Sequence, residues 1–263
     1  MSKKNKLSVL IIAGNEEKNI KDCLESVKWA DEIVLIDSES KDKTIEIAKQ
    51  FTDKIFIKKW EGFSPQRKYG LEKVSYDWVL SLDADERVSD ELKNEIQRLL
   101  NSEPKFDSYL IPRKNFFLGK HITSCNWSPD YQLRLFKKNK ASVTNRKVHE
   151  GYYVEGERGK LKGKLIHYTH QSIAVTIDKI NYYSTLEAQE KFNKKKVSCL
   201  DILIHPFAAF FSHFILRRGF KDGIHGLMVS IIHAMTNILT YMKIWEIQNT
   251  GNRNMQLNEK EKK

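Results

Sequence analysis

The sequence is poor in cysteine and lacks a glycine-rich phosphate loop. Its 263 residues include only Cys23, Cys125 and Cys199, an odd number without ligand-like spacing. This pattern indicates neither a disulfide framework nor a cysteine-rich zinc site, and it is typical of a reducing cytoplasm. Neither G-x-G-x-x-G nor G-x-x-x-x-G-K-[ST] follows the first apolar run. The commonest dinucleotide and P-loop sites are therefore excluded.

The N-terminus also lacks a long hydrophobic run. The apolar residues from Leu7 to Ala13 are too few for a signal peptide with a cleavage site, and the polar segment 14–17 follows directly. We therefore expect the protein to remain inside the cell. The formal net charge of +11 predicts an acidic partner, which could be nucleic acid, anionic lipid or a phosphorylated substrate.

Apolar runs alternate with helical patterns through the first hundred residues. The runs typical of strands buried in a parallel sheet are 7–13, 32–37, 53–57 and 78–82. The segments between them carry apolar residues at helical spacing, for example Ile20, Cys23, Leu24 and Val27 behind a possible cap at Asn15. This order predicts an α/β fold with a mostly parallel, Rossmann-like sheet. Shorter strands are expected at 109–112 and 132–136.

Three carboxylates follow the strand at 78–82. Asp83, Asp85 and Glu86 come at its carboxyl end, where open α/β sheets bind their ligands. In an extended chain, residues two apart lie on one side, so Asp83 and Asp85 would face the same ligand. A divalent cation on a diphosphate fits such a pair. The alternative is a polar turn in which residues 85–89 cap the next helix.

Five short segments occur in the order found in one known family. They are 12–16, 36–44, 62–68, 80–86 and 148–150. Together they resemble family 2 of the inverting glycosyltransferases, which has the GT-A fold, and most closely its bacterial lipopolysaccharide-core β-glucosyltransferase-like branch. The resemblance implies metal-dependent transfer of a sugar from a nucleotide-sugar, expected to be a UDP-hexose, to a glycolipid or lipopolysaccharide-core acceptor. The expected cofactor is Mn²⁺ or Mg²⁺.

The resemblance also implies roles in donor binding. Asp37 is expected to recognise the nucleotide base, Asp83 to lie near the ribose and Lys68 to neutralise phosphate charge. Asp85 is expected to ligate the metal together with His167.

His170 competes with His167 for the ligand role. Glu150 stands where the family has its catalytic base, which would deprotonate the acceptor hydroxyl. The family's usual Glu-Asp pair is His149–Glu150 here, which makes Asp130 the substitute candidate. Glu39 and Lys43 stand where the family often has glycine, so this loop is expected to run differently.

The composition changes in the last third of the chain. We predict a catalytic domain at 1–185, with a nucleotide-sugar half at about 1–103 and an acceptor half at about 104–185. A helical, amphipathic region at 186–248 and a disordered tail at 249–263 follow.

The helical region could contact a membrane. A helix from Gly226 to Met242 would extend only ~26 Å against a hydrocarbon core of ~30 Å. We therefore predict that this region lies peripherally on the anionic inner face of the cell membrane. Packing on the catalytic domain or on a second subunit of a homo-oligomer is the alternative.

Two other functions fit parts of the sequence. A metal-dependent phosphatase also uses Asp-x-Asp after a buried strand, but it needs a nucleophilic aspartate on the first strand, which has none. A basic nucleic-acid-binding protein would fit the net charge, but the lysines are scattered among acids and no recognised binding motif occurs. We therefore expect no nucleic-acid partner.

Overall fold

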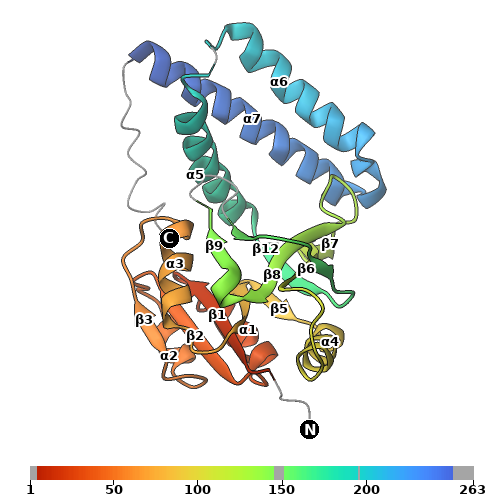
Figure 1. The fold of residues 1–263 in the computed structure, drawn as a ribbon. Coiled ribbons are helices and arrows are strands. Elements are labelled where there is room, and N and C mark those ends of the chain that lie inside the picture. Colours follow the sequence, from red (N-terminus) through yellow and green to blue (C-terminus); the bar gives the residue numbers. More distant parts are fainter. Residues whose placement is uncertain (1–4, 145–150, 195, 251–263) are drawn as a thin grey trace. The chain divides into compact units, whose positions relative to one another are not determined.

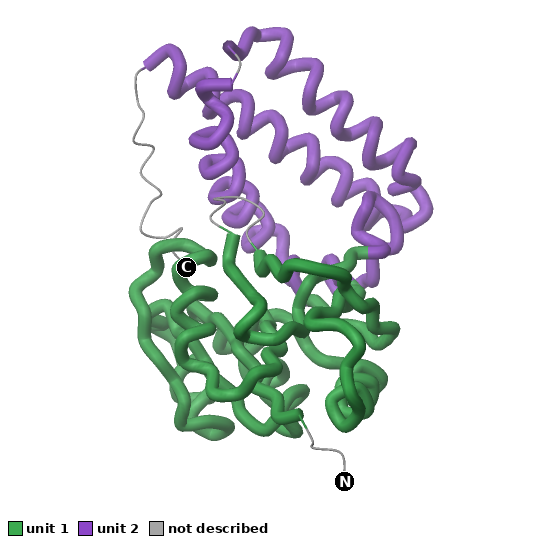
Figure 2. The backbone as a smooth tube through the Cα atoms, viewed as in Figure 1, with its two compact units in different colours: residues 1–114, 130–167 green, residues 115–129, 168–263 purple. Residues whose placement is uncertain are grey.

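The computed structural model describes residues 5–144, 151–194 and 196–250 (Figure 1). The chain divides into two compact units (Figure 2). Unit 1 consists of residues 1–114 and 130–167, and unit 2 of residues 115–129 and 168–263. The division at 167/168 differs from the boundary near 185 that the composition suggested. The assignment of functional domains stays a prediction, because compactness does not define function.

Parallel strands form the centre of unit 1. They are β1 (Leu7–Ala13), β2 (Glu32–Asp37), β3 (Ile55–Ile57) and β4 (Trp78–Asp83), in the spatial order β3-β2-β1-β4. All three contacts between neighbours are parallel, as predicted. The sheet continues past β4 with β8 (Asp130–Lys137), β6 (Ser108–Phe117), β12 (Leu165–His170) and β5 (Glu86–Val88). Because β8 is antiparallel to β4, the whole sheet is mixed.

Alternate residues of β1 enter two different hydrophobic clusters. Val9 and Ile11 pack with α1 (Ile20–Val27), α2 (Thr44–Ala48) and α4 (Asp90–Leu100). Leu10 and Ile12 belong to the cluster beside α3 (Phe63–Lys73). At Gly70 of α3, a Cβ atom would come within 2.6 Å of Leu10, so glycine allows this close approach. A strand that is covered on both faces is apolar throughout. For this reason the apolar run at 7–13 predicted β1 correctly.

The remaining strands of the described residues are short. They are β7 (Lys120–His121), β9 (Ala141–Val143), β10 (Tyr152–Val154) and β11 (Gly159–Lys160). The strands β9 and β10 form a separate antiparallel pair.

The first helix begins later than the sequence suggested. Its N-cap is Asn19, so the expected cap at Asn15 was wrong. Asn15 instead has φ 54°, and its side-chain oxygen accepts a hydrogen bond from the backbone N–H of Lys41 at 2.8 Å. The loops after β1 and β2 contact each other here, which places Asn15 outside the helix.

Unit 2 is mainly helical. Its helices are α5 (Ile173–Lys191), α6 (Cys199–Phe211), a π-helical turn (Ser212–Leu216), a 3-10 turn (Gly219–Asp222) and α7 (Ile224–Thr250). The helices α6 and α7 run side by side as a hairpin (Figure 1). With 27 residues, α7 extends ~40 Å. The expectation that this helix is too short to cross a bilayer was therefore wrong.

By length and composition alone, Cys199–Leu216 and Ile224–Thr250 could each cross a membrane. The predicted tail at 249–263 begins inside α7, which continues to Thr250. The rest of that tail, 251–263, lies outside the described residues.

Glu32 joins three neighbouring segments at the amino ends of the parallel strands. Its carboxylate accepts hydrogen bonds from Ser8 Oγ, from the Ser75 backbone N–H and hydroxyl at 2.8 and 2.6 Å, and from Lys54 Nζ. Burial by itself raises the pKa of Glu32, but the hydrogen bonds from Lys54 and Ser75 outweigh it and lower the pKa to about 2. The ionised carboxylate therefore stabilises the fold.

Glu32→Gln should lower the free energy of unfolding at pH 7 by about 2–3 kcal/mol, because hydrogen bonds to a charged acceptor are lost. The pKa is lower in the folded protein, so this contribution is complete above about pH 4.5 and is lost as the pH falls toward 2. Urea unfolding between pH 2 and pH 8 should show the difference from wild type shrinking below about pH 4.5. The exposed Glu46→Gln is the control, and a pH-independent difference for E32Q would contradict this account.

Candidate functional site

The chain turns sharply between Asp83 and Asp85. Asp83 ends β4, Ala84 and Asp85 form a turn, and Glu86 begins β5. Residues 84 and 85 therefore form the turn that was the alternative to an extended chain, while a shared ligand for the two aspartates stays a prediction. The described partners of the two carboxylates differ. Residues 85–89 were alternatively expected to cap the next helix. Ser89 does so, since it is the N-cap of α4 and accepts a hydrogen bond from the Leu92 backbone N–H.

Asp83 lies between two arginines. Arg67 Nη2 is 3.2 Å from its Oδ1, and Arg134 Nη2 forms a shorter ion pair with its Oδ2. Both guanidinium groups are buried. Burial alone raises the pKa of Asp83, but the charges of Arg134 and Arg67 outweigh this and hold the pKa well below its usual range. Asp83 is therefore a permanent anion in a fixed position.

The ion pairs continue from Arg134 along the sheet. Its Nη2 also pairs with Oε1 of the fully buried Glu86 at 2.8 Å. The Nη1 of Arg113 contacts the same oxygen at 3.3 Å, while its Nη2 pairs with Asp130 at 2.7 Å. Opposite charges thus alternate from Arg67 to Asp130 across β4, β5, β6 and β8. None of these three arginines was recognised from sequence as part of the site.

Asp85 faces a histidine. Its Oδ1 lies 3.5 Å from His167 Nε2, and both side chains are largely buried. Residue 167 reaches this position because β12 pairs with β5, with His167 opposite Glu86. Carboxylate and imidazole are a donor set that suits Mn²⁺ and allows Mg²⁺. Among the described residues no third His, Cys, Asp or Glu completes a metal-binding group. The pair therefore fits an ion that takes further ligands from a substrate.

The two substitute candidates have other partners. His170 belongs to unit 2, where its Nδ1 lies 3.1 Å from Thr176 Oγ1 and its ring stacks on Trp127. Asp130 accepts hydrogen bonds from Arg113 Nε at 2.8 Å and Gln132 Nε2 at 2.6 Å. These contacts hold both side chains in place, and the choice between them and the first candidates stays a prediction.

Asp37 ends β2 and is fully buried. Its carboxylate accepts hydrogen bonds from the Ser40 backbone N–H at 2.8 Å and the Ser40 hydroxyl at 2.6 Å. The Ser40 hydroxyl also accepts one from the Asn15 backbone N–H. Asp37 thus orders the loops that follow β1 and β2. In the same loop Glu39 has φ 61°, the conformation that glycine favours, so the backbone there keeps a glycine-like turn.

Lys68 is exposed on α3, whereas its neighbour Arg67 points inward to Asp83. The helical spacing of Phe63, Arg67 and Gly70 could have indicated that Arg67 faces inward. Glu150, the expected base, lies outside the described residues, as does His149. The roles of Lys68 and Glu150 stay predictions.

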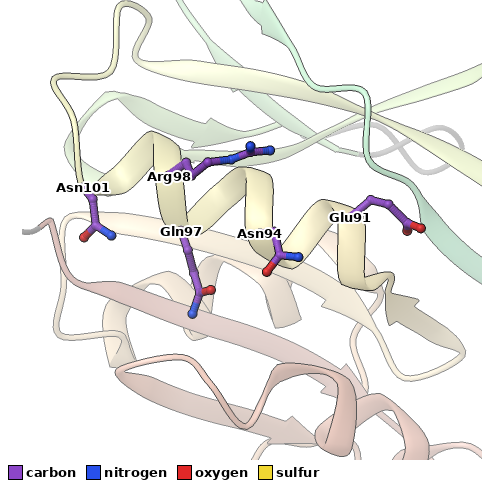
Figure 3. A pocket seen from close by; sticks show the side chains of 5 residues that line it. All are labelled: Glu91, Asn94, Gln97, Arg98 and Asn101. Atoms are coloured by element: carbon purple, nitrogen blue, oxygen red, sulfur yellow. The ribbon is translucent and has the colours of Figure 1, made fainter.

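An open depression lies on the outer face of α4 (Figure 3). Its lining consists of Glu91, Asn94, Gln97, Arg98 and Asn101. It includes none of the acids or arginines described above, and it is on a helix face, not at the strand ends where α/β sheets bind ligands. We do not assign the candidate site to it.

Residues 8–154 match glycosyl transferase family 2, and this match covers more than half of the chain. The chain belongs to this family. A lipopolysaccharide core biosynthesis glycosyltransferase from Rhizobium meliloti, LpsC, is 30% identical, with 91% of this chain and 92% of LpsC aligned. An uncharacterised glycosyltransferase from Rickettsia bellii is 32% identical over 92% of this chain and 87% of its own. The S. aureus TarS structure in complex with UDP-GlcNAc is 15% identical in sequence and has a TM-score of 0.48. The alignment covers 94% of this chain and 92% of the TarS chain.

This family 2 glycosyltransferase therefore has the predicted GT-A type of fold, a mostly parallel α/β sheet with C-terminal helices. The family assignment decides against the phosphatase and nucleic-acid-binding alternatives. The family's Asp-x-Asp segment is the one that the structure places at the end of β4.

Arg134→Met should lower the free energy of unfolding by about 3–5 kcal/mol, because it leaves the buried Glu86 and Asp83 without a shared counter-charge. Urea unfolding at pH 7 measures this loss. The exposed Arg158→Met is the control and should change stability by about 0.5 kcal/mol or less. A loss for R134M no larger than that of the control would show that the ion pairs are unimportant.

Proposed function

We propose that this glycosyltransferase transfers a hexose, with inversion, from a UDP-sugar to a glycolipid or lipopolysaccharide-core acceptor. The observation that carries the proposal is the end of β4, where Asp83 is held by two arginines and Asp85 lies 3.5 Å from His167. Such a site separates a fixed anion from a pair of metal donors. The uridine preference and the inversion rest on the resemblance to the branch of the family described above.

Each acid has its own task in this proposal. Asp37 recognises the base, Asp83 accepts hydrogen bonds from the ribose hydroxyls, and Lys68 offers a positive charge to the phosphates. The low pKa of Asp83 supports its role, because an ionised carboxylate is a strong hydrogen-bond acceptor. The arginines that lower this pKa also fix the direction of the carboxylate.

Asp85 and His167 would hold the divalent cation, whose bound form neutralises charge that develops on the leaving diphosphate. The reaction itself needs one displacement. The acceptor oxygen forms a bond to the anomeric carbon while the bond from that carbon to the diphosphate oxygen breaks. Glu150 takes the proton of the acceptor hydroxyl, and the nucleoside diphosphate leaves with the bonding electron pair.

The acceptor class is supported by the similarity to LpsC, whose name assigns it to lipopolysaccharide core biosynthesis. Exposed apolar side chains on α6 and α7 support a location at a membrane, where such acceptors are found. We propose a peripheral location on the inner face of the cell membrane.

Asp85→Asn and His167→Ala should each abolish metal-dependent binding of the donor. A bound ligand raises stability by RT ln(1 + [L]/Kd), so wild type should show a higher Tm with UDP-sugar and Mn²⁺ together than with either alone. The gain should vanish in both variants and persist in the exposed control Asp53→Asn. The same gain in D85N as in wild type would refute the metal assignment, and no gain with any sugar nucleotide would refute the transferase proposal.

Glu150→Gln should lower kcat about 10²–10⁴-fold with little effect on donor affinity, because only proton removal from the acceptor is impaired. Initial rates of nucleoside diphosphate release and titration of the donor measure the two effects separately. The matched control is Glu157→Gln, an exposed acid in the same region. Near-normal kcat in E150Q, with loss in Asp130→Asn, would assign the base to Asp130.

A further inference from the structure

The side of α7 that faces the rest of unit 2 carries apolar residues, Val229, Ile244 and Ile247, and polar residues as well. Lys243 Nζ donates hydrogen bonds to the backbone and side-chain oxygens of Asn181, both at 2.7 Å, and to Ser184 Oγ and Thr185 Oγ1 at 2.9 and 2.7 Å. All three partners belong to α5. Thr240, one helical turn earlier, is buried as well. The three N–H groups of the Lys243 ammonium share the four oxygens and fix this face of α7 against α5.

The apolar side of α7 is turned outward. The exposed residues, spaced three or four apart, are Ile231, Met235, Ile238, Met242 and Trp245. A surface helix in water normally has polar residues on this side, because its apolar stripe faces the core. The outer face of α7 therefore suits an apolar environment.

The partner helix presents a similar face. Its exposed apolar residues are Leu200, Leu203, Ile204, Phe207 and Phe211, and Phe207 is 74% exposed. Only 11% of the stretch Cys199–Leu216 and 22% of Ile224–Thr250 is buried. The composition of α6 and α7 is as apolar as that of core helices in globular proteins. Unlike core helices, however, α6 and α7 are mostly exposed.

The turn between the helices, residues 215–224, mixes apolar and basic side chains. Leu216, Phe220 and Ile224 are 69%, 51% and 57% exposed. Between them lie three exposed basic residues, Arg217, Arg218 and Lys221.

The single acid of this turn, Asp222, is buried, and its carboxylate is hydrogen-bonded within unit 2. Its carboxylate accepts hydrogen bonds from the backbone N–H groups of Thr123 and Ser124, both at 2.9 Å, and from the Ser124 hydroxyl at 2.6 Å. The exposed surface of the turn therefore carries positive charge alone.

We propose that the α6–α7 hairpin, residues 199–250, binds the surface of an anionic lipid bilayer, and that the turn at 215–224 enters the headgroup region. Apolar side chains would lie at the boundary of the acyl chains, while Arg217, Arg218 and Lys221 contact lipid phosphates. This inference specifies the lipid charge and the contacting segment, and it does not depend on the sugar-transfer proposal.

Two features favour a bilayer surface over other environments. The helix α5, which packs along α7, carries the exposed charged residues Asp178, Glu190 and Lys191, so a hairpin that crossed the membrane would draw charge into the hydrocarbon. If a second copy of the chain packed on the turn, its basic residues would repel Arg217, Arg218 and Lys221. Anionic headgroups instead attract these basic residues.

Flotation of the full chain with vesicles tests the proposal. Wild type should bind vesicles of phosphatidylglycerol and phosphatidylcholine at least about tenfold more tightly than pure phosphatidylcholine, and 1 M salt should weaken this binding. Lys221→Glu should weaken it at least about fivefold, and Leu216→Ser about tenfold. The matched controls in unit 1, Lys49→Glu and Ile57→Ser, alter an exposed lysine and an exposed isoleucine and should bind as wild type does.

Equal binding to neutral and anionic vesicles, or equal losses in the control variants, would overturn the proposal. It would also fail if the chain formed a stable dimer in sedimentation equilibrium that L216S dissociates while vesicles do not bind. Because all substituted residues are exposed, thermal unfolding should be unchanged, which separates lost binding from lost fold. Donor hydrolysis without vesicles reports on the transferase proposal independently, since L216S and K221E should leave it unaltered.

Discussion

The ion pairs of Arg134 with Asp83 and Glu86 determine the form of the candidate site. Two carboxylates at the end of a buried strand would repel each other and lose hydration, and a single guanidinium between them removes both costs. Arg67 and Arg113 extend the alternation of charge at either side. As a result Asp83 stays ionised and immobile. Asp85 lies in the turn that follows β4, where its carboxylate contacts His167.

This division explains how a sheet without a glycine-rich loop can serve a diphosphate. In P-loop and dinucleotide-binding folds, backbone N–H groups at a helix N-terminus meet the phosphates. In this family 2 chain the corresponding loops, after β1 and β2, are instead hydrogen-bonded to each other through Asn15, Asp37 and Ser40. In the proposed reaction, neutralisation of the phosphates would therefore fall to a cation and to basic side chains.

Unit 2 follows a different physical rule from unit 1. In unit 1 the apolar residues of β1 and β4 are buried, as expected for a domain in water. In unit 2, Lys243 and the buried Thr240 of α7 form hydrogen bonds to α5, while Met242 and Trp245 are exposed. The basic turn between α6 and α7 adds a charge of one sign. Both features are expected where a protein meets an anionic lipid surface.

The sequence by itself determined the parallel strands, the family and the carboxylate cluster after β4, because these depend on local patterns: a strand buried on both faces is apolar throughout, and motif order is linear. It did not reveal the arginines at 67, 113 and 134, since the partners of Asp83 and Glu86 are distant along the chain. It also left open whether residues 84 and 85 continue the strand or form a turn, because both fit the local pattern. Only the tertiary structure decided which carboxylate pairs with arginine and which with histidine, because strand pairing between β5 and β12 brings His167 to Asp85.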